Sequence, residues 1–356
     1  MIVLYILLAI LMFSVLIFIH ELGHFIAAKL SGVQVNEFSL FMGPALWKRQ
    51  KGETLYALRL IPIGGYCAME GEDGQSDNPR AFGKAKLWKR LIILAAGAAM
   101  NFVFGVLLAV LFTSLCYKDG LPAKTITGQR DAAVASDFQA GDELYSIDGE
   151  RIYILNDLFL MMDRTPKDTY DVVVVRDGKK VTLNDADLSL HTFQNKEGKD
   201  YRAYTFYITD AEPTVGSVLS YSWNLSIDFA RLVRLGLQDL FRGKASIKDI
   251  GGPVMIVESV AETSAKAENV GMGLLNVLYF FSFIAINLAV MNLLPIPALD
   301  GGRDKPLQLP HNRLHVRVAT RYRAYVAHVY RKIGLQGFEC GFVEFQRVRT
   351  LRLALL

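Results

Sequence analysis

Three long segments without a charged residue constrain this 356-residue chain more than any other feature. They are residues 1–19, 91–117 and 271–299, and two prolines, Pro295 and Pro297, should end the last helix just before them. A helix that crosses the hydrocarbon core of a bilayer needs about 20 apolar residues. With 21% charged residues and a mean hydropathy of +0.26, the chain is predicted to be a polytopic α-helical membrane protein with three spans.

Basic residues next to the spans predict their orientation. Lys29 follows the first span, and a basic cluster precedes the second, formed by Lys84, Lys86, Lys89 and Arg90. Because cytoplasmic loops are enriched in Lys and Arg, residues 25–90 should be cytoplasmic, and the N-terminus and residues 118–270 should lie outside. The first segment lacks a basic leader and a small-residue cleavage site, which favours a permanent span over a removable signal peptide.

Residues 36–66 contain extended apolar runs separated by Gly43-Pro44 and Gly64-Gly65. This pattern predicts a β-hairpin that lies at or dips into the membrane. Backbone at that depth requires protein or a water-filled cavity to satisfy its amide groups. An ordinary cytoplasmic hairpin fits the same pattern.

Residues 125–190 have the mixed composition of a small α+β module. Strand runs at 171–175 and 180–183 flank an Asp177-Gly178 turn, and a further strand lies between Gly141 and Gly149. Asn156 is predicted to cap a helix whose apolar side chains are Leu158, Phe159, Met161 and Met162. The order of these elements resembles a PDZ domain of the bacterial protease type, which would bind a peptide or a C-terminus by strand addition. A spacer module with an unused groove is the alternative.

Residues 217–241 are long enough to span a membrane but contain several charges, including Asp228, Arg231 and Arg234. A helix that lies in the plane of the membrane interface fits this composition better. A fourth span would be the competing interpretation.

The first span runs directly into His20-Glu21-Leu22-Gly23-His24. On a helix, residues four apart share a face, so both imidazoles can bind one Zn²⁺ while Glu21 takes a proton from a water on the metal. Ionisable residues at the end of a hydrophobic span are costly in hydrocarbon and by default indicate function. The pattern therefore predicts a zinc-dependent hydrolase.

A catalytic zinc site requires a third protein ligand. In a metzincin this would be a His six residues after His24, but Leu30 stands there. Asp300 follows the proline-broken end of the third span, on the same predicted membrane face as the two histidines. We therefore expect Asp300 to complete the site, although a carboxylate before Gly301-Gly302 is also typical of a turn.

Three motifs together carry a family resemblance: HELGH, GAAMN at 97–101 and NLLPIPALDGG at 292–302. Over residues 1–303 the chain resembles the site-2 protease family of intramembrane zinc metalloproteases, in its bacterial PDZ-containing branch. The resemblance implies a catalytic base, three Zn²⁺ ligands and residues that hold or closely approach the substrate backbone. The implied base is Glu21, and the implied Zn²⁺ ligands are His20, His24 and Asp300. The residues implied at the substrate backbone are Asn292, Asn101, Gly64 and Gly65.

The sequence as a whole predicts a domain plan of seven parts, of which the first six lie in the region of the resemblance. They are a first span with HExxH (1–24), a membrane-associated β-hairpin loop (25–90), a second span (91–117), an extracytoplasmic PDZ-like domain (118–212), an interfacial amphipathic helix (213–250), a third span with the LDG motif (251–303) and a basic tail (304–356).

The implied function is cleavage of single-pass proteins within their transmembrane segments in the bacterial cytoplasmic (inner) membrane. Anti-sigma factors and remnant signal peptides are the implied substrates, and the lipid bilayer surrounds both enzyme and substrate. An inactive or truncated PDZ membrane adaptor is the main alternative, and a metal-ion transporter using His20, His24 and Asp300 is a weaker one.

The tail accounts for the basic charge of the chain. Residues 304–356 contain 10 Lys+Arg and 3 Asp+Glu, against 29 and 32 in the rest, so no nucleic-acid partner is expected. The family continues here with an apolar fourth span, and we hypothesise a shift of reading frame after Arg303. Reading the coding DNA in its other two frames should reveal an apolar stretch of span length; otherwise the tail is an extension suited to anionic lipid.

Overall fold

The computed structural model describes residues 2–72, 76–131, 136–195, 198–242 and 253–293. The chain divides into two compact units. Unit 1 comprises the described residues within Met1–Phe112 and Phe229–Lys332, and unit 2 comprises those within Thr113–Asp228. Each unit is described by itself.

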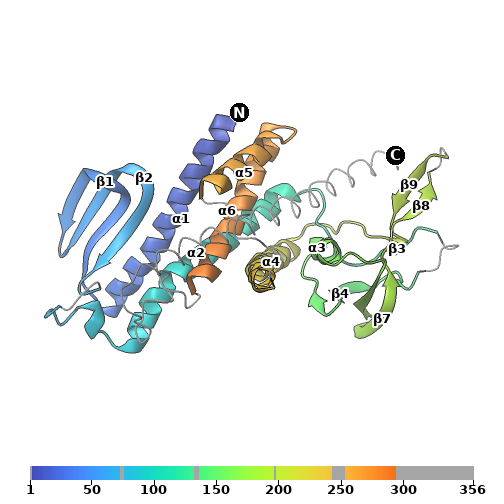
Figure 1. Ribbon diagram of the computed structural model, residues 1–356, viewed down its shortest axis with the longest axis horizontal. Helices are drawn as coiled ribbons and strands as arrows, with labels where there is room; N and C mark the ends of the chain where they lie inside the picture. Colours follow the sequence, from blue (N-terminus) through green and yellow to red (C-terminus); the bar gives the residue numbers. More distant parts are fainter. Residues whose placement is uncertain (1, 73–75, 132–135, 196–197, 243–252, 294–356) are drawn as a thin grey trace. The chain divides into compact units, whose positions relative to one another are not determined.

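Unit 1 is built on three long apolar helices, α1 (Ile2–Ser31), α2 (Leu87–Cys116) and α6 (Val270–Leu293) (Figure 1). Each is long and apolar enough to cross a membrane, which confirms the three predicted spans at the level of length and composition. The helix α1 extends past His24 because no residue interrupts it before Gly32, whose φ of +79° ends the helix in a left-handed conformation.

The long helices carry apolar side chains outside and polar groups inside. Leu7 on α1 and Leu107 on α2 are 60% and 61% exposed. Two buried hydroxyl groups find partners on other elements: Ser14 Oγ donates to Pro62 O (2.8 Å) and Ser282 Oγ donates to Gly105 O (2.8 Å). This distribution is the one expected for helices surrounded by lipid, where buried polar groups need internal partners.

The segment after α1 forms two long strands, β1 (Val35–Lys51) and β2 (Thr54–Met69), joined by a tight turn. Both strands bend, so residues 37–40 pair with 65–68 on one side and with 55–58 on the other. The expected short hairpin is therefore a small sheet in which part of each strand pairs on both of its edges. The bends fall at residues that adopt positive φ, among them Gly43 and Gly64, both at 84°.

The part of this sheet around residues 42–47 exposes apolar side chains, including Met42 (49%), Leu46 (64%) and Trp47 (51%). The first residues of β1 and the last residues of β2 are buried against the end of α1 and the start of α2. This core contains Ala27, Ala28, Val33, Val35, Cys67, Met69, Phe82, Ile93 and Leu94. The sheet is thus anchored to both helices. Its association with membrane stays a prediction.

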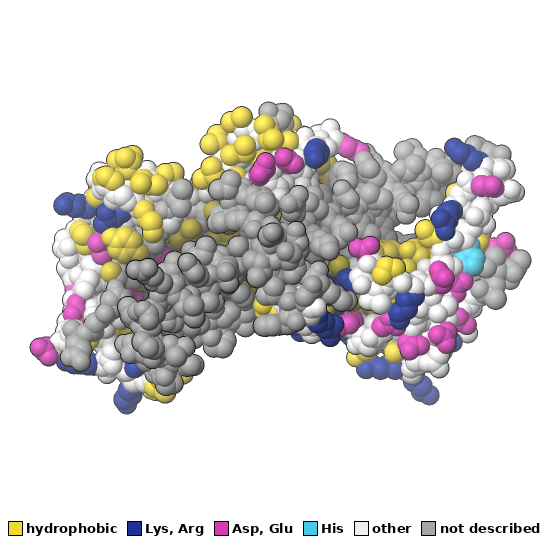
Figure 2. All heavy atoms as spheres, in the orientation of Figure 1, with side chains coloured by type: hydrophobic (Ala, Val, Ile, Leu, Met, Phe, Trp, Pro, Cys, Tyr) yellow, Lys and Arg dark blue, Asp and Glu magenta, His cyan; other side chains and the backbone are white. Residues whose placement is uncertain are grey.

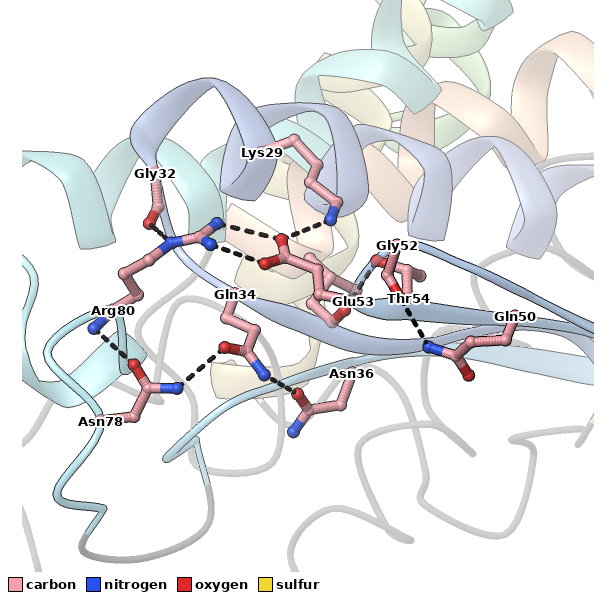
Figure 3. A network of polar contacts seen from close by, with 11 residues as sticks. Lys29, Gly32, Gln34, Asn36, Gln50, Gly52, Glu53, Thr54, Asn78 and Arg80 are labelled. Carbon is pink, nitrogen blue, oxygen red and sulfur yellow. Dashed lines mark hydrogen bonds and ion pairs between the residues drawn. The ribbon is translucent and has the colours of Figure 1, made fainter.

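A cluster of ionic hydrogen bonds joins the β1–β2 turn to the end of α1 (Figure 3). Glu53 accepts from Lys29 Nζ (2.7 Å) and from two nitrogens of Arg80 (2.6 and 3.0 Å). Arg80 also donates to Gly32 O (3.0 Å), the first residue after the helix. We call Lys29, Glu53 and Arg80 the turn clamp.

The region before the third span contains a separate helix, α5 (Pro253–Ala265), which the domain plan did not anticipate. It packs against α1 and α6. The break before α6 has a local cause, because Asn269 Oδ1 accepts from Met272 N (2.9 Å) and so caps the new helix. The predicted amphipathic helix is present as α4 (Val215–Phe241), which is not among the helices suited to span a membrane.

Unit 2 contains a four-stranded antiparallel sheet of order β5-β4-β6-β7, made of Glu150–Arg151, Glu143–Ile147, Thr169–Arg176 and Lys179–Asp187. The predicted turn between β6 and β7 is present, with Asp177 and Gly178 at φ of 50° and 74°. Two short pairs, β3 (Gly128–Gln129) with β10 (Phe206–Tyr207) and β8 (His191–Gln194) with β9 (Asp200–Ala203), complete the strands.

The predicted helix of unit 2 is present as α3, which covers Asn156–Arg164 and includes the four predicted apolar residues. The predicted cap at Asn156 is wrong: this residue is already helical, and no side chain caps the preceding Leu155. Instead Asp157 Oδ2 accepts from Tyr153 N (2.6 Å) and Ile154 N (3.1 Å), so a carboxylate satisfies the incoming loop. The module is α+β; its likeness to a PDZ domain stays a prediction.

The surfaces of the two units differ in kind. On the face in Figure 2, charged side chains are frequent around the four-stranded sheet of unit 2, whereas hydrophobic side chains gather over the β1–β2 sheet and the ends of α1 and α5. Unit 2 has an apolar core of its own, with Phe138, Leu144, Ile147, Val172 and Val174 all at most 1% exposed.

Candidate metal centre

Two rows of residues face each other where α1 and α2 pack. His20 and His24 form one row on α1, and Ile93, Gly97 and Asn101 form the other on α2. Both rows have a spacing of four residues, which places their members on one face of a helix. The two histidines are buried, at 9% and 6% exposure.

The two imidazoles meet at their Nε2 atoms, which lie 3.1 Å apart. The rings are nearly perpendicular, at 85°, with centroids 4.7 Å apart. Two nitrogens that bind one tetrahedral Zn²⁺ at 2.0–2.1 Å are separated by about 3.3 Å. The spacing and the chemistry of this pair therefore fit a shared zinc ion.

Gly97 provides the space in which these nitrogens meet. A Cβ at this position would lie 2.5 Å from His24 Nε2 and 2.9 Å from His20 Nε2. Gly23 on α1 has the same function toward α2, since a Cβ there would collide with Ala96 O. Two glycines thus allow the helices to approach, and the absence of a side chain at Gly97 avoids a collision with both rings.

The other ring nitrogen of each histidine contacts α2. His24 Nδ1 is 2.8 Å from Ile93 O, and His20 Nδ1 is 3.3 Å from Asn101 Nδ2. A carbonyl oxygen only accepts, so Nδ1 of His24 carries the hydrogen and Nε2 keeps a lone pair. Contacts of this type hold metal-binding imidazoles in the required orientation.

The half-buried Glu21 lies beside strand β2. A Cβ at Gly65 would be 3.8 Å from Glu21 Cγ and 3.0 Å from Ser39 O, so glycine brings the β2 backbone close to the carboxylate side chain. The neighbouring Gly64 has a φ of 84°, which a residue with a side chain rarely adopts. Gly65 therefore adjoins the HExxH helix, whereas a Cβ at Gly64 would meet the Met42 side chain.

The remaining predicted site residues are at or beyond the end of α6. Asn292 is half-buried in the last turn of this helix, and Asp300 lies outside the described residues. Among the described residues, no group of three or more His, Cys, Asp or Glu side chains forms a metal site. The structure thus brings together His20, His24, Gly97 and Asn101, with Glu21 and Gly65 adjacent.

Sequence reasoning missed two parts of this centre, the need for a residue without a side chain at Gly97 and the carbonyl of Ile93. The motif GAAMN was recognised only as a family feature. A signal was present in the four-residue spacing of positions 93, 97 and 101, which repeats the spacing of the histidines. Nothing in the sequence indicated which face of α2 meets α1.

Comparison with known proteins supports the same chemistry. Residues 8–310 match peptidase family M50. A relative from Clostridium perfringens is 33% identical over 302 residues, 84% of this chain and 86% of that protein, and one from Clostridium acetobutylicum is 36% identical over 304 residues, 83% and 84%. The names of both describe zinc metalloproteases.

A third relative is the regulator of sigma-W protease RasP of Bacillus subtilis, which is 25% identical over 379 residues, 83% of this chain and 87% of that protein. The family match includes the HExxH helix, the GAAMN segment and the LDG motif. The chain therefore belongs to peptidase family M50, the family of site-2 proteases, and is a zinc metalloprotease of the membrane.

Proposed function

We propose that this metalloprotease hydrolyses a peptide bond within a transmembrane segment of a single-pass membrane protein. The observation that carries the proposal is the buried pair of Nε2 atoms, 3.1 Å apart, on a helix apolar enough to cross a membrane. A hydrolytic centre at that place meets substrates that are themselves in the bilayer. By the distribution of basic residues, cleavage occurs near the cytoplasmic face.

The proposed ligands are His20, His24 and Asp300. When bound, Zn²⁺ polarises the scissile carbonyl and makes water acidic enough to attack at neutral pH. Glu21 accepts the proton of the attacking water and delivers it to the nitrogen of the leaving amine. Its position beside the histidines on α1 supports this role, because the proton then moves only a short distance.

A helical substrate has to unwind before its carbonyl can be attacked, since a helix engages its own carbonyl groups. We propose that the β2 backbone at Gly64 and Gly65 accepts the extended substrate as an added strand. The absence of side chains at these two residues and the proximity of Gly65 to Glu21 support this position. As the family resemblance implies, Asn292 and Asn101 are proposed to hold the substrate backbone.

Unit 2 is proposed to be a PDZ-like domain outside the cytoplasm that binds a peptide or a free C-terminus. A first protease would expose such an end, so that only trimmed substrates are admitted. One relative is named as a regulator of sigma-W protease, which supports anti-sigma factors as substrates in the bacterial cytoplasmic membrane. Remnant signal peptides are a second substrate class of the same topology.

The test uses the full chain in lipid nanodiscs with bound Zn²⁺ and a model single-pass substrate labelled at both ends. Glu21→Gln should abolish cleavage while zinc content stays unchanged, because the ligands remain. Glu258→Gln, the same change at an exposed residue of α5, should cleave as the wild type does. Cleavage that survives Glu21→Gln would remove the assignment of the base.

The adaptor alternative makes a different prediction. A wild-type protein that holds one zinc ion per chain, binds the trimmed substrate and leaves it uncut would favour an inactive PDZ adaptor. The same assay therefore separates the two functions, provided that zinc content and substrate binding are measured alongside cleavage.

A further inference from the structure

The two histidines of the centre differ in what contacts their Nδ1 atoms. A neutral imidazole has one N–H, and only the nitrogen without hydrogen can bind a metal. For His24 the partner is the carbonyl of Ile93, which only accepts, so Nε2 is available. For His20 the partner is the side-chain amide of Asn101, which can either donate or accept.

In the observed orientation, Asn101 Nδ2 is 3.3 Å from His20 Nδ1. The amide N–H donates, so the hydrogen of His20 is on Nε2, from which it points to His24 Nε2. This orientation leaves Asn101 Oδ1 buried and without a hydrogen-bond partner in the described part of the chain, in a residue that is 1% exposed. A buried acceptor without a partner is unfavourable.

Turning the amide by 180° gives Asn101 Oδ1 a donor and takes the hydrogen off His20 Nε2. Oxygen and nitrogen of an asparagine amide have nearly the same shape, so the turned side chain occupies the same space. Oδ1 then accepts from Nδ1–H of His20, and Nε2 presents a lone pair. The hydrogen of His20 moves from Nε2 to Nδ1, and the imidazole neither gains nor loses a proton.

We propose that Asn101 is a positioning residue for the metal site: its amide turns over when His20 binds Zn²⁺ and holds the ring through an Nδ1–H to Oδ1 hydrogen bond. This inference rests on the proposed role of His20 and His24 as ligands. It gives Asn101 a function in metal binding that is separate from contact with substrate. Ile93 O performs the corresponding task for His24 with a group that needs no turning.

The experiment measures the affinity of the full chain for Zn²⁺ by competition with a chelator. Asn101→Leu removes the acceptor at similar volume and should weaken zinc binding about 10–100-fold, the usual effect of losing such a partner. Asn101→Asp provides an acceptor and should stay within a few-fold of the wild type. Asn287→Leu is the matched control, because Asn287 is 2% exposed but donates within its own helix to Phe283 O.

Wild-type zinc affinity in Asn101→Leu would overturn the inference, as would an Asn101→Asp protein that is weakened equally. Asn101→Ala removes the acceptor without adding bulk and decides the matter if the Leu variant does not fold. A role confined to substrate would raise KM and leave zinc affinity unchanged. The variant His24→Ala distinguishes failure of the ligand assignment from failure of the role of Asn101. If His24→Ala binds zinc as tightly as the wild type, the ligand assignment is wrong. If His24→Ala loses zinc while the Asn101 variants keep it, only the role of Asn101 is wrong.

Discussion

The two units of this protein satisfy their buried polar groups in different ways. In unit 1 the partners come from separate elements: Asn101 and His20 are 81 residues apart, and Ile93 and His24 are 69 apart. In unit 2 a buried carboxylate finds its partner within one sheet: Asp142, just before β4, accepts hydrogen bonds from Arg176 on the adjacent β6. The polar interior of unit 1 therefore depends on helix packing, whereas that of unit 2 depends on strand pairing.

Function and stability therefore depend on different interactions in the two units. Helices surrounded by lipid gain little by burying apolar groups, so small residues and hydrogen bonds between helices decide how they pack. Unit 2 has an apolar core and a charged exterior, and its stability follows from burial of apolar surface. A change at the helix contact should affect zinc chemistry, and a change in the sheet should affect folding of unit 2.

The largest expected effect is that of Gly97→Ala. The new methyl group would lie within 3 Å of Nε2 of both histidines, so zinc affinity should fall at least about 100-fold, the upper end of what losing an outer partner costs. Proteolysis should be lost with it. Zinc content and cleavage of the model substrate measure this, and hydrogen exchange of β4 and β6 should remain as in the wild type.

Gly105→Ala is the matched control for that prediction. Its Cβ would lie 2.5 Å from Ile286 Cγ1, so it disturbs the packing of α2 on α6 without touching a metal nitrogen. This variant should lose stability but keep its zinc affinity, because the proposed ligands His20 and His24 are not disturbed. Equal loss of zinc in both variants would show that helix packing in general, rather than the open position at Gly97, controls the site.

An intermediate effect is expected for Asp142→Asn in unit 2. The Asp142 carboxylate is fully buried and accepts from Arg176 Nε (2.7 Å), from a second Arg176 nitrogen (2.8 Å) and from Gln139 N (2.8 Å). Burial alone would raise the pKa of this carboxyl, but the hydrogen bonds from Arg176 and Gln139 outweigh it and lower the pKa. Removing the charge should destabilise unit 2 by about 3 kcal/mol.

The sign of the pH dependence follows from the lowered pKa. The stabilising contribution of Asp142 is present above the unfolded value of about 3.9 and is lost as pH falls through the lower folded value. Unfolding of unit 2 at pH 7 and at pH 3 should show a larger loss of stability in acid for the wild type than for Asp142→Asn, which keeps only the contribution of groups such as Asp187. Asp177→Asn, at an exposed position of the same hairpin, should retain the wild-type profile.

The smallest effect is expected at the turn clamp of unit 1. Glu53→Gln removes the charge that receives Lys29 and Arg80, whose side chains are 30% and 47% exposed. Water and salt screen such pairs, so the loss should be about 0.2–1 kcal/mol and should shrink in high salt. The unfolding temperature at two salt concentrations measures it.

Glu262→Gln provides the reference for this small effect. Its pair with Lys266 is longer, at 3.8 Å, and more exposed, at 49% and 79%, so no measurable change is expected. A Glu53→Gln protein that cleaves substrate much more slowly at unchanged stability would contradict the view that the clamp only anchors the sheet.

Much of the helical part could be predicted because it depends on local composition. The absence of charges located the three spans, although α2 begins at Leu87, before the charged Lys89 and Arg90 that were placed outside it. Long basic side chains reach from a helix end into the interface, so counting uncharged residues shortens a span. The helix α5 was missed because its 13 residues, including two glutamates, resemble a loop.

The sheet could be predicted only in part. The apolar runs and glycine turns of residues 36–66 indicated paired strands, but bending of both strands doubled their pairing. Such bends depend on positive φ at residues that include Phe41, which is not a typical residue for that conformation. Pairing of one segment of β1 with two separate parts of β2 leaves no periodic signal in the sequence.

The sequence by itself determined the reaction class, because HExxH at the end of an apolar span combines a helical four-residue spacing with a charge that lipid does not tolerate. Only the tertiary structure decided how the pair is oriented: Gly97 opens the space, Ile93 holds His24 and Asn101 holds His20. The physical reason is that helical periodicity is local, whereas the faces that two helices present to each other are chosen by close packing across more than 60 intervening residues.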